Sequence, residues 1–453
     1  MKQLGMSVRP QGRGLRGAAV AALALGCCLA QARVAEAVTC RVEPMRSIIM
    51  ADTSETMMVK VSLKGGVVPA ANRAPINLCL VIDRSGSMQG DRIARAKEAA
   101  IAAVERLTPE DIVSVVIFDQ QIDTIVPAQY VQDKASIVNA IRAVQSRGST
   151  AIFGAMAQAA AEIRKNAHRE YLNRVILLSD GQANVGPSQP SDFGRLGVSL
   201  MKEGISVSTV GVGLDFNEDL MTNLSGKSDG NNYFVENSDD LPRIFSSELG
   251  TALNVVARSV SLRIVFAPGT TPLEIVGREG SINGETVTLD FNQLYGGQEK
   301  YVLVRTAFSP GKDDTSRHVA TANVKYVDTA TSRSEQLATT GSVRFSKNAE
   351  LVRRSVNTDV LREAELNEDA IATEKALRLI DEGKKKEAAV IFETQKRRLE
   401  TVAREVPAMA PVAKGRAIMQ ERNVERASSG TFDARDRKEN VKRNYEVQNQ
   451  QAP

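Results

Sequence analysis

INLCLVIDRSGSM, at residues 76–88, joins an apolar run to a short polar loop. The run Ile76–Ile82 is almost continuously apolar, which is typical of a strand buried on both faces of a parallel sheet. Asp83, Ser85 and Ser87 follow at a spacing of two, and helical periodicity then runs from Asp91 to Leu107. The stretch therefore predicts a strand, a tight loop and a helix, the repeating unit of an α/β domain.

The same alternation continues to about residue 256. Further buried strands are expected at Ile112–Phe118, Val175–Leu178 and Ile205–Val212. Helical spacing separates or follows them at Asp133–Val144, Ile152–Lys165, Phe193–Glu203 and Asp240–Val256. We predict a doubly wound, mainly parallel α/β domain over residues 76–256.

Alternating strands flank this domain on both sides. They are expected at Met57–Leu63, Val260–Phe266, Glu285–Phe291, Tyr301–Phe308 and Val319–Val327, with an Asn283-Gly284 turn. Met57–Leu63 has no partner strand unless it pairs with strands after residue 257. We therefore predict a β-sandwich made of residues 38–75 plus 257–347, with the α/β domain inserted into it.

The C-terminal part is helical and charged. Two apolar faces separated by Glu382-Gly383-Lys384 predict a helical hairpin over residues 356–406, which resembles a single tetratricopeptide unit. Such a unit cannot bury its own face, so it is expected to pack on the sandwich or on a partner. Apolar periodicity fades after Pro407, and residues 407–453 are predicted to be a disordered tail.

The loop after the first strand carries the chemistry. A carboxylate and two hydroxyls at spacing two can direct three oxygens into one small volume, at the strand end where open α/β sheets bind ligands. Such oxygens suit Mg²⁺, with Mn²⁺ or Ca²⁺ as alternatives, rather than zinc or copper. Without further residues, the same motif is often only a turn that caps the next helix.

Leu80–Met88 resembles the opening of a von Willebrand factor type A (vWA) domain, and the exported bacterial proteins of this type are the closer comparison. The family's metal-ion-dependent adhesion site (MIDAS) also needs a threonine and an aspartate from two later loops. Arg147-Gly148-Ser149-Thr150-Ala151 supplies Thr150, and Leu177-Leu178-Ser179-Asp180-Gly181 supplies Asp180.

The resemblance implies that Ser85, Ser87 and Thr150 bind the cation directly. Asp83 and Asp180 would bind it directly or through water, leaving one position open. In the family, that position takes an Asp or Glu of a protein partner. The implied function is a non-enzymatic, metal-dependent adhesion or assembly module.

Three alternatives remain open. The chain could be a metal-independent scaffold that acts through its helical hairpin, or a hydrolase in which the metal activates water. It could also be an intracellular chelatase-like vWA protein that works with an AAA⁺ partner. No general base is visible beside the site, which argues against the hydrolase.

Residues 1–32 have the pattern of a signal peptide. A basic start precedes the apolar stretch Gly17–Ala30 and an Ala30-Gln31-Ala32 cleavage pattern. Export to the periplasm, the cell surface or the medium is expected, with an uncleaved anchor or a lipid on Cys27 or Cys28 as alternatives. The apolar run is too short for a transmembrane span, so none is expected in the mature chain.

Composition excludes several classes. The 453 residues are 42% hydrophobic and 25% charged, as in soluble globular proteins. The net charge of +4 comes from four basic residues within 1–32, so the remainder is neutral and lacks the basic surface of a nucleic-acid-binding protein. Two histidines and no CxxC motif exclude an ordinary zinc site. Cys40 and Cys79 could pair outside the cytoplasm, although Cys79 lies in a strand and suits a buried thiol.

Overall fold

The computed structural model describes residues 37–67, 73–167 and 171–451. The predicted signal peptide at residues 1–32 lies outside the described residues. In the inserted α/β domain, buried strands form a central sheet. The six strands are ordered β6-β5-β4-β7-β8-β9. Their bounds are β4 Ile76–Asp83, β5 Ile112–Phe118, β6 Ile122–Tyr130, β7 Leu172–Ser179, β8 Ile205–Val212 and β9 Asn232–Val235.

All neighbouring strands in this sheet are parallel except β6, which pairs antiparallel with β5 at the edge. The sequence analysis did not identify β6. It contains Pro127, which an edge strand tolerates because its outer N–H groups need no partner. The predicted α/β fold with a mainly parallel sheet is confirmed.

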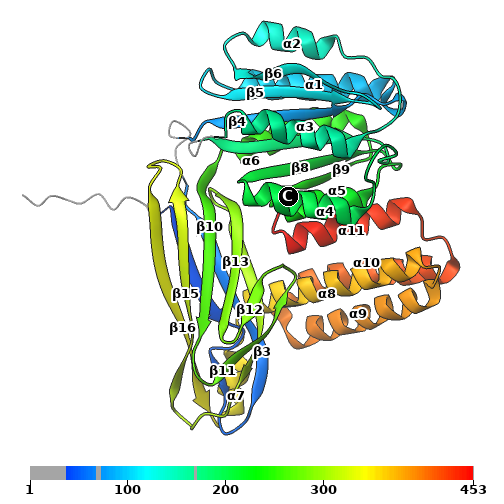
Figure 1. Ribbon diagram of the computed structural model, residues 1–453. Helices are drawn as coiled ribbons and strands as arrows, with labels where there is room; N and C mark the ends of the chain where they lie inside the picture. The colour runs from blue at the N-terminus through cyan, green and yellow to red at the C-terminus, as the bar shows by residue number, and fades with distance from the viewer. Residues whose placement is uncertain (1–36, 68–72, 168–170, 452–453) are drawn as a thin grey trace, which may run out of the picture. The chain divides into compact units, whose positions relative to one another are not determined.

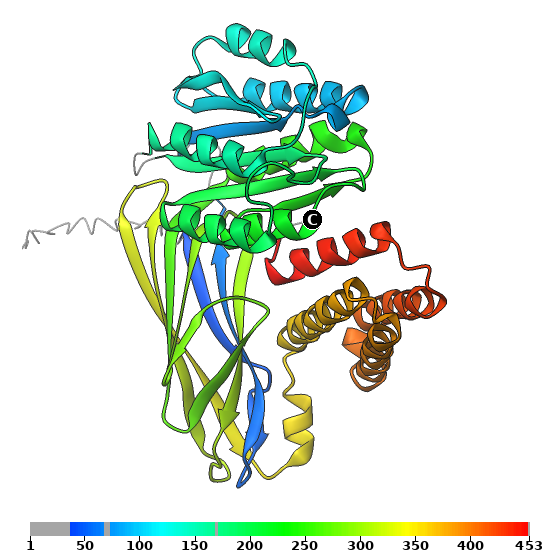
Figure 2. The same ribbon diagram turned by 45° about the vertical axis from the view of Figure 1, so that its right-hand side comes forward.

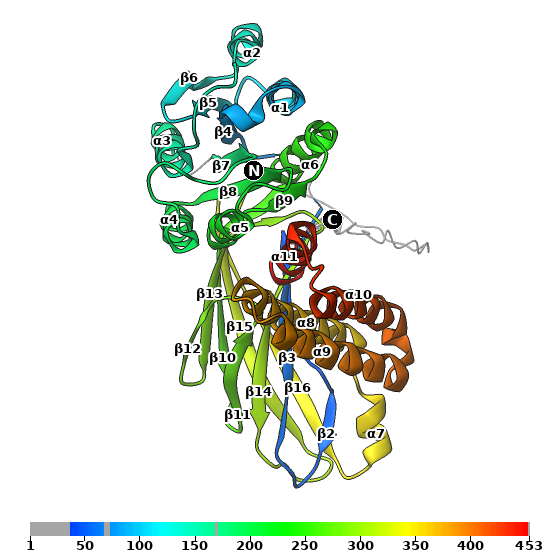
Figure 3. The same cartoon turned by 90° about the vertical axis from the view of Figure 1, so that its right-hand side faces the viewer.

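Helices cover both faces of the sheet. One core joins it to α1 (Asp91–Arg106), α2 (Lys134–Arg142) and α6 (Leu241–Ala252). The other joins it to α3 (Ile152–Arg164), α4 (Pro190–Lys202) and α5 (Glu218–Lys227). Figure 3 shows α1 and α6 on one side of the sheet and α3 and α4 on the other. Helix α6 ends at Ala252, earlier than expected, because Val255 begins strand β10.

Two sheets of mainly antiparallel strands form the sandwich, and their strands come from both sides of the inserted domain. One sheet has the order β1-β3-β14-β11 and the other β12-β13-β10-β15-β16-β2. Their bounds are β1 Val38–Pro44, β2 Ile48–Met50, β3 Glu55–Gly65, β10 Val255–Phe266, β11 Thr270–Val276, β12 Ser281–Asn283, β13 Thr286–Tyr295, β14 Glu299–Phe308, β15 Ser316–Asp328 and β16 Ser334–Ser346. Strand β3 pairs with β14, so segments on either side of the α/β domain share one sheet (Figure 1).

Helices make up the rest of the chain. They are α7 (Ala349–Arg354), α8 (Thr358–Asp381), α9 (Lys385–Glu405), α10 (Ala410–Ser429) and α11 (Ala434–Gln448), with a 3-10 turn at Pro407–Met409. The first turns of α8 pack against β3, β11 and β14 through Val360 and Ala364. Figure 2 shows α11, in red, lying between the other C-terminal helices and the α/β domain. No helix among the described residues is long and apolar enough to cross a bilayer.

The prediction of a disordered tail over residues 407–453 was wrong for its described part. Helices α10 and α11 are built around buried polar side chains rather than an apolar stripe, so hydropathy did not reveal them. Asn423 and Asn440 hydrogen-bond to each other at 3.0 Å, and Gln420 donates to Asp369 at 2.7 Å and to Thr373 at 2.9 Å. Buried polar networks of this kind hold helices together without hydrophobic periodicity.

Candidate metal centre

Three loops meet at the carboxyl end of the central strands. Asp83 is the last residue of β4, and Asp180 directly follows the end of β7 at Ser179. These strands are parallel neighbours, so their ends reach the same edge of the sheet. Thr150 lies two residues before α3 begins at Ile152, and Gly86 N–H binds Gly148 O at 3.0 Å, which joins its loop to the first one.

The hydroxyls and carboxylates of the predicted site form a chain of short contacts. Ser85 Oγ lies 3.1 Å from Ser87 Oγ, and Ser87 Oγ donates to Asp180 Oδ1 at 2.7 Å. Asp83 accepts a bond from the backbone N–H of Ser85 at 2.8 Å. Four of the five predicted residues are therefore linked directly.

Thr150 reaches the same place through the third loop. Its N–H donates to Asn184 Oδ1 at 2.8 Å, and its carbonyl accepts from Asn184 N–H at 3.1 Å, which fixes the backbone beside Asp180. A Cβ atom added at Gly181 would lie 3.2 Å from Thr150 Oγ1 and 3.8 Å from Ser87 Oγ. Both hydroxyls thus border the space that glycine leaves open.

Asp83 is held by a residue that the sequence analysis did not assign. Ser179 Oγ donates to Asp83 Oδ2 at 2.5 Å. Burial raises the pKa of Asp83 to about 6, the bonds from Ser179 and Ser85 oppose that shift, and the charge of Asp180 adds to it. Ser179 directly precedes Asp180 in the quoted motif. Its position at the end of a strand is the signal from which the sequence could have identified it as a site residue.

Arg92, on the first turn of α1, was also missed. Its Nη1 lies 2.6 Å from Asp180 Oδ2, and Asp180 is fully buried while Arg92 is a third exposed. The two oxygens of Asp180 therefore have different partners, Ser87 on one side and Arg92 on the other. Arg92 occurs only five residues after Ser87, but nothing in its spacing indicated which acid it would meet.

A second charged cluster supports the loops from behind. Buried Asp119 pairs with Arg84 at 3.1 Å and with Arg147 at 2.8 Å. Burial opposes ionisation of Asp119, but bonds from Gln121 N–H and Arg147 and the charge of Arg84 outweigh it and lower its pKa. Arg84 and Arg147 belong to the first two site loops, so Asp119 ties these loops together.

The donor set suits a hard divalent cation. Among the described residues, no group of three or more His, Cys, Asp or Glu could hold a metal. Any metal at this place would therefore depend on serine and threonine hydroxyls beside two carboxylates, which are ligands of Mg²⁺ or Ca²⁺ rather than of zinc. Asp83, Ser85, Ser87, Thr150 and Asp180 have the chemistry and proximity to hold such an ion.

Residues 77–247 match the family model of the von Willebrand factor type A domain. The chain contains a vWA domain. The solved structures that share its fold include a von Willebrand factor type A protein from Catenulispora acidiphila (TM-score 0.67, 17% identity, 84% of this chain and 88% of that chain) and the ArnB paralog VWA2 from Sulfolobus acidocaldarius (TM-score 0.58, 17% identity, 91% and 98%).

Curated relatives match about half of this chain. The uncharacterized protein sll0103 of Synechocystis is 29% identical over 48% of this chain and 51% of its own length. Inter-alpha-trypsin inhibitor heavy chain H2 of Homo sapiens is 27% identical over 55% of this chain and 25% of its own length. The chain thus spans about half of the first relative and a quarter of the second. vWA domains are typically modules for protein interaction.

Proposed function

We propose that this vWA domain binds a divalent cation, Mg²⁺ first, at Asp83, Ser85, Ser87, Thr150 and Asp180. Through the cation it would bind an Asp or Glu side chain of a protein partner. The observation that carries the proposal is the contact chain of Ser85, Ser87 and Asp180, which gathers oxygens from separate loops within 3.1 Å of one another.

The balance of charge in the donor set supports a carboxylate as the external ligand. Only two of the five side chains are acids, and Arg92 already offsets the charge of Asp180. A divalent cation held mainly by neutral hydroxyls remains electrophilic and favours an additional anionic oxygen. The bound cation would form one bond to the carboxylate of the partner, and the protein loops would fix the direction of that bond.

Apolar side chains beside the site support a protein partner. Val185 is 37% exposed, and its N–H donates to Thr150 O. Leu214 is 36% exposed and follows Gly213, which lies beside the guanidinium of Arg92. Apolar contacts around a central polar bond are typical of protein interfaces. We further propose that the chain is not an enzyme and that it acts after export, which rests on the sequence pattern of residues 1–32.

Calorimetric titration of the chelator-stripped chain with Mg²⁺, Mn²⁺ and Ca²⁺ tests the metal site. Saturable binding is expected in the wild type and in Asp91→Ala, which changes an exposed acid at the start of α1, and is expected to be lost in Asp83→Ala. A folded wild type that binds none of the three ions would overturn the proposal and favour a metal-independent scaffold.

A second titration tests the carboxylate. Short peptides that differ only by Asp or Asn at one position are added in Mg²⁺ and in EDTA. Binding of the Asp peptides only in Mg²⁺ is expected. Equal binding of the Asn peptides would show that the cation does not select a carboxylate.

A further inference from the structure

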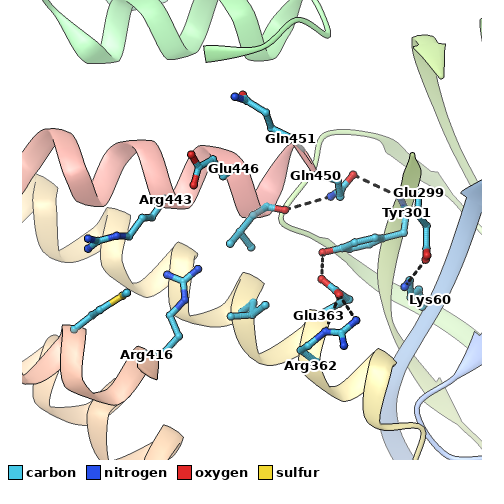
Figure 4. A pocket seen from close by; sticks show the side chains of 13 residues that line it. Lys60, Glu299, Tyr301, Arg362, Glu363, Arg416, Arg443, Glu446, Gln450 and Gln451 are labelled. Carbon is cyan, nitrogen blue, oxygen red and sulfur yellow. Dashed lines mark hydrogen bonds and ion pairs between the residues drawn. The ribbon is translucent and has the colours of Figure 1, made fainter. Parts of the chain in front are cut away.

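A second candidate site lies between the sandwich and the C-terminal helices. A cavity of about 560 Å³ opens between strands β3 and β14 and helices α8, α10 and α11 (Figure 4). This volume is within the range of small-molecule sites in proteins. None of its lining residues belongs to the five-residue metal set.

The charges on the sandwich side of the cavity are paired. Lys60 Nζ lies 2.6 Å from Glu299, and Arg362 lies 3.0 Å from Glu363. Tyr301 Oη donates to Glu363 at 2.6 Å. These groups satisfy one another, so this wall carries no uncompensated charge.

The wall formed by α10 and α11 is different, because Arg416 lacks a comparable partner. Arg416 makes no hydrogen bond among the described residues, and its one ion pair, with Asp369, is long at 3.7 Å. Its side chain is only 16% exposed. Arg443, whose Nη2 lies 3.2 Å from Glu439, lines the same wall.

These surroundings are unfavourable for the Arg416 cation. Burial lowers the pKa of Arg416, the charge of Asp369 opposes this, the like charge of Arg443 lowers it further, and the charge of Glu446, which also lines this wall, raises it. Asp369 Oδ2 itself has no hydrogen-bond partner among the described residues. A largely buried guanidinium with donors that no described protein group accepts, beside a second arginine at a cavity, suits an anionic ligand.

We propose that Arg416 and Arg443 bind the anionic group, a carboxylate or a phosphate, of a small organic ligand in this cavity. Guanidinium groups bind both anions through paired, charge-assisted hydrogen bonds. The body of the ligand would contact Leu366, Met419 and Val447, which supply the apolar lining. The ligand would thus bridge α8, α10 and α11.

Titration of the full chain with four probes tests the proposal. Hexanoate and hexyl phosphate carry both the anion and the apolar body, inorganic phosphate carries only the charge, and hexanol only the body. The first two are expected to bind saturably, and whichever binds more tightly identifies the preferred headgroup. Phosphate and hexanol are expected to bind at least about tenfold more weakly, because each lacks half of the contacts.

Substitutions assign the site to its residues. Arg416→Met is expected to weaken the better probe by about tenfold or more, since it removes a charge-assisted contact. Lys414→Met, an exposed lysine of the same helix outside the cavity, should leave binding unchanged. Arg443→Met provides a second test if Arg416→Met does not fold.

Several outcomes would overturn the proposal. They are no saturable binding of either anionic probe, binding of hexanol as tight as that of hexanoate, and wild-type affinity in folded Arg416→Met or Arg443→Met. If binding persists in both variants, the anion contacts other cations and the assignment to this wall is wrong.

Discussion

At the scale of single residues, the carboxyl group of Asp83 determines how the candidate metal centre responds to pH. Its pKa, raised by burial to about 6, lies above the ordinary value of 3.8. The folded metal-free chain therefore holds this proton more tightly than the unfolded chain does. Stability from this group is complete below pH 4 and is lost as the pH rises through 6.

Comparison with Asp83→Asn isolates this effect from other titrating groups. The free energy of unfolding of the wild type minus that of the variant, measured by urea titration in EDTA, is expected to fall as the pH rises. A shift in pKa from 3.8 to about 6 corresponds to about 3 kcal/mol in total, most of which is lost between pH 4 and pH 8. A difference that does not vary with pH would contradict the pKa assigned to Asp83.

Arg92 is expected to compete with the proposed cation. Its guanidinium already neutralises Asp180 at 2.6 Å, and a divalent ion beside it would meet a like charge. Arg92→Met should therefore bind Mg²⁺ about tenfold more tightly, corresponding to about 1.4 kcal/mol. Arg95→Met on the same helix is the control, because Arg95 pairs with Glu98 and Asp239 instead. Weaker Mg²⁺ binding in Arg92→Met would show that Arg92 positions Asp180 rather than competing with the ion.

At the scale of elements, α11 attaches the C-terminal helices to the vWA domain. The side chain of Lys438 is buried. It pairs with Glu218 at the start of α5 and donates to Phe216 O at 2.6 Å. Arg437 joins the same acid at 2.6 Å. Burial opposes ionisation of Glu218, but Lys438 and Arg437 outweigh it and lower its pKa. This contribution is present at neutral pH and is lost as the pH falls through the lowered value.

A double-mutant cycle measures this attachment. Glu218→Gln and Lys438→Met are each expected to lower the free energy of unfolding by about 3 kcal/mol, because each removes one partner of a largely buried ion pair. The double variant should recover part of that loss. The exposed pair Arg435–Glu236, also between α11 and the vWA domain, should couple by less than about 1 kcal/mol. Equal coupling in both pairs would mean that burial does not govern this interface.

At the scale of the whole molecule, buried polar contacts join the vWA domain to the sandwich, and from Ala37 onward the chain forms one compact unit. Asp229, after α5, accepts from Lys300 Nζ at 2.6 Å and from Asn292 N–H at 2.7 Å. Arg174 of β7 hydrogen-bonds to the hydroxyl of Tyr295 at the end of β13. These contacts make the domains dependent on each other.

Lys300→Met tests that dependence. It leaves the Asp229 carboxylate without its cation, and a loss of about 3–5 kcal/mol in the free energy of unfolding is expected. The vWA domain and the sandwich should still unfold in one transition, because both sides lose the same contact. Lys325→Met, an exposed lysine of β15, should change stability by no more than about 0.5 kcal/mol. A variant as stable as the control would show that the Asp229–Lys300 pair does not join the domains.

The sequence alone determined the α/β domain, and it also predicted which residues make up the candidate site. Buried parallel strands produce continuous apolar runs, and site residues at strand ends stand in short local motifs, so both can be seen along the chain. Asp83, Ser85 and Ser87 formed one such motif, and Thr150 and Asp180 followed in the expected loops.

Only the tertiary structure revealed the partner of Arg92, the folding of residues 410–448 into helices α10 and α11, and the cavity at Arg416. Arg92 meets Asp180 across 88 residues, and Lys438 meets Glu218 across 220. Helices α10 and α11 bury asparagine, glutamine and charged side chains, whose hydrogen bonds depend on partners distant in the chain. Hydropathy records the burial of apolar surface within a segment, whereas polar contacts of this kind exist only once the segments have met.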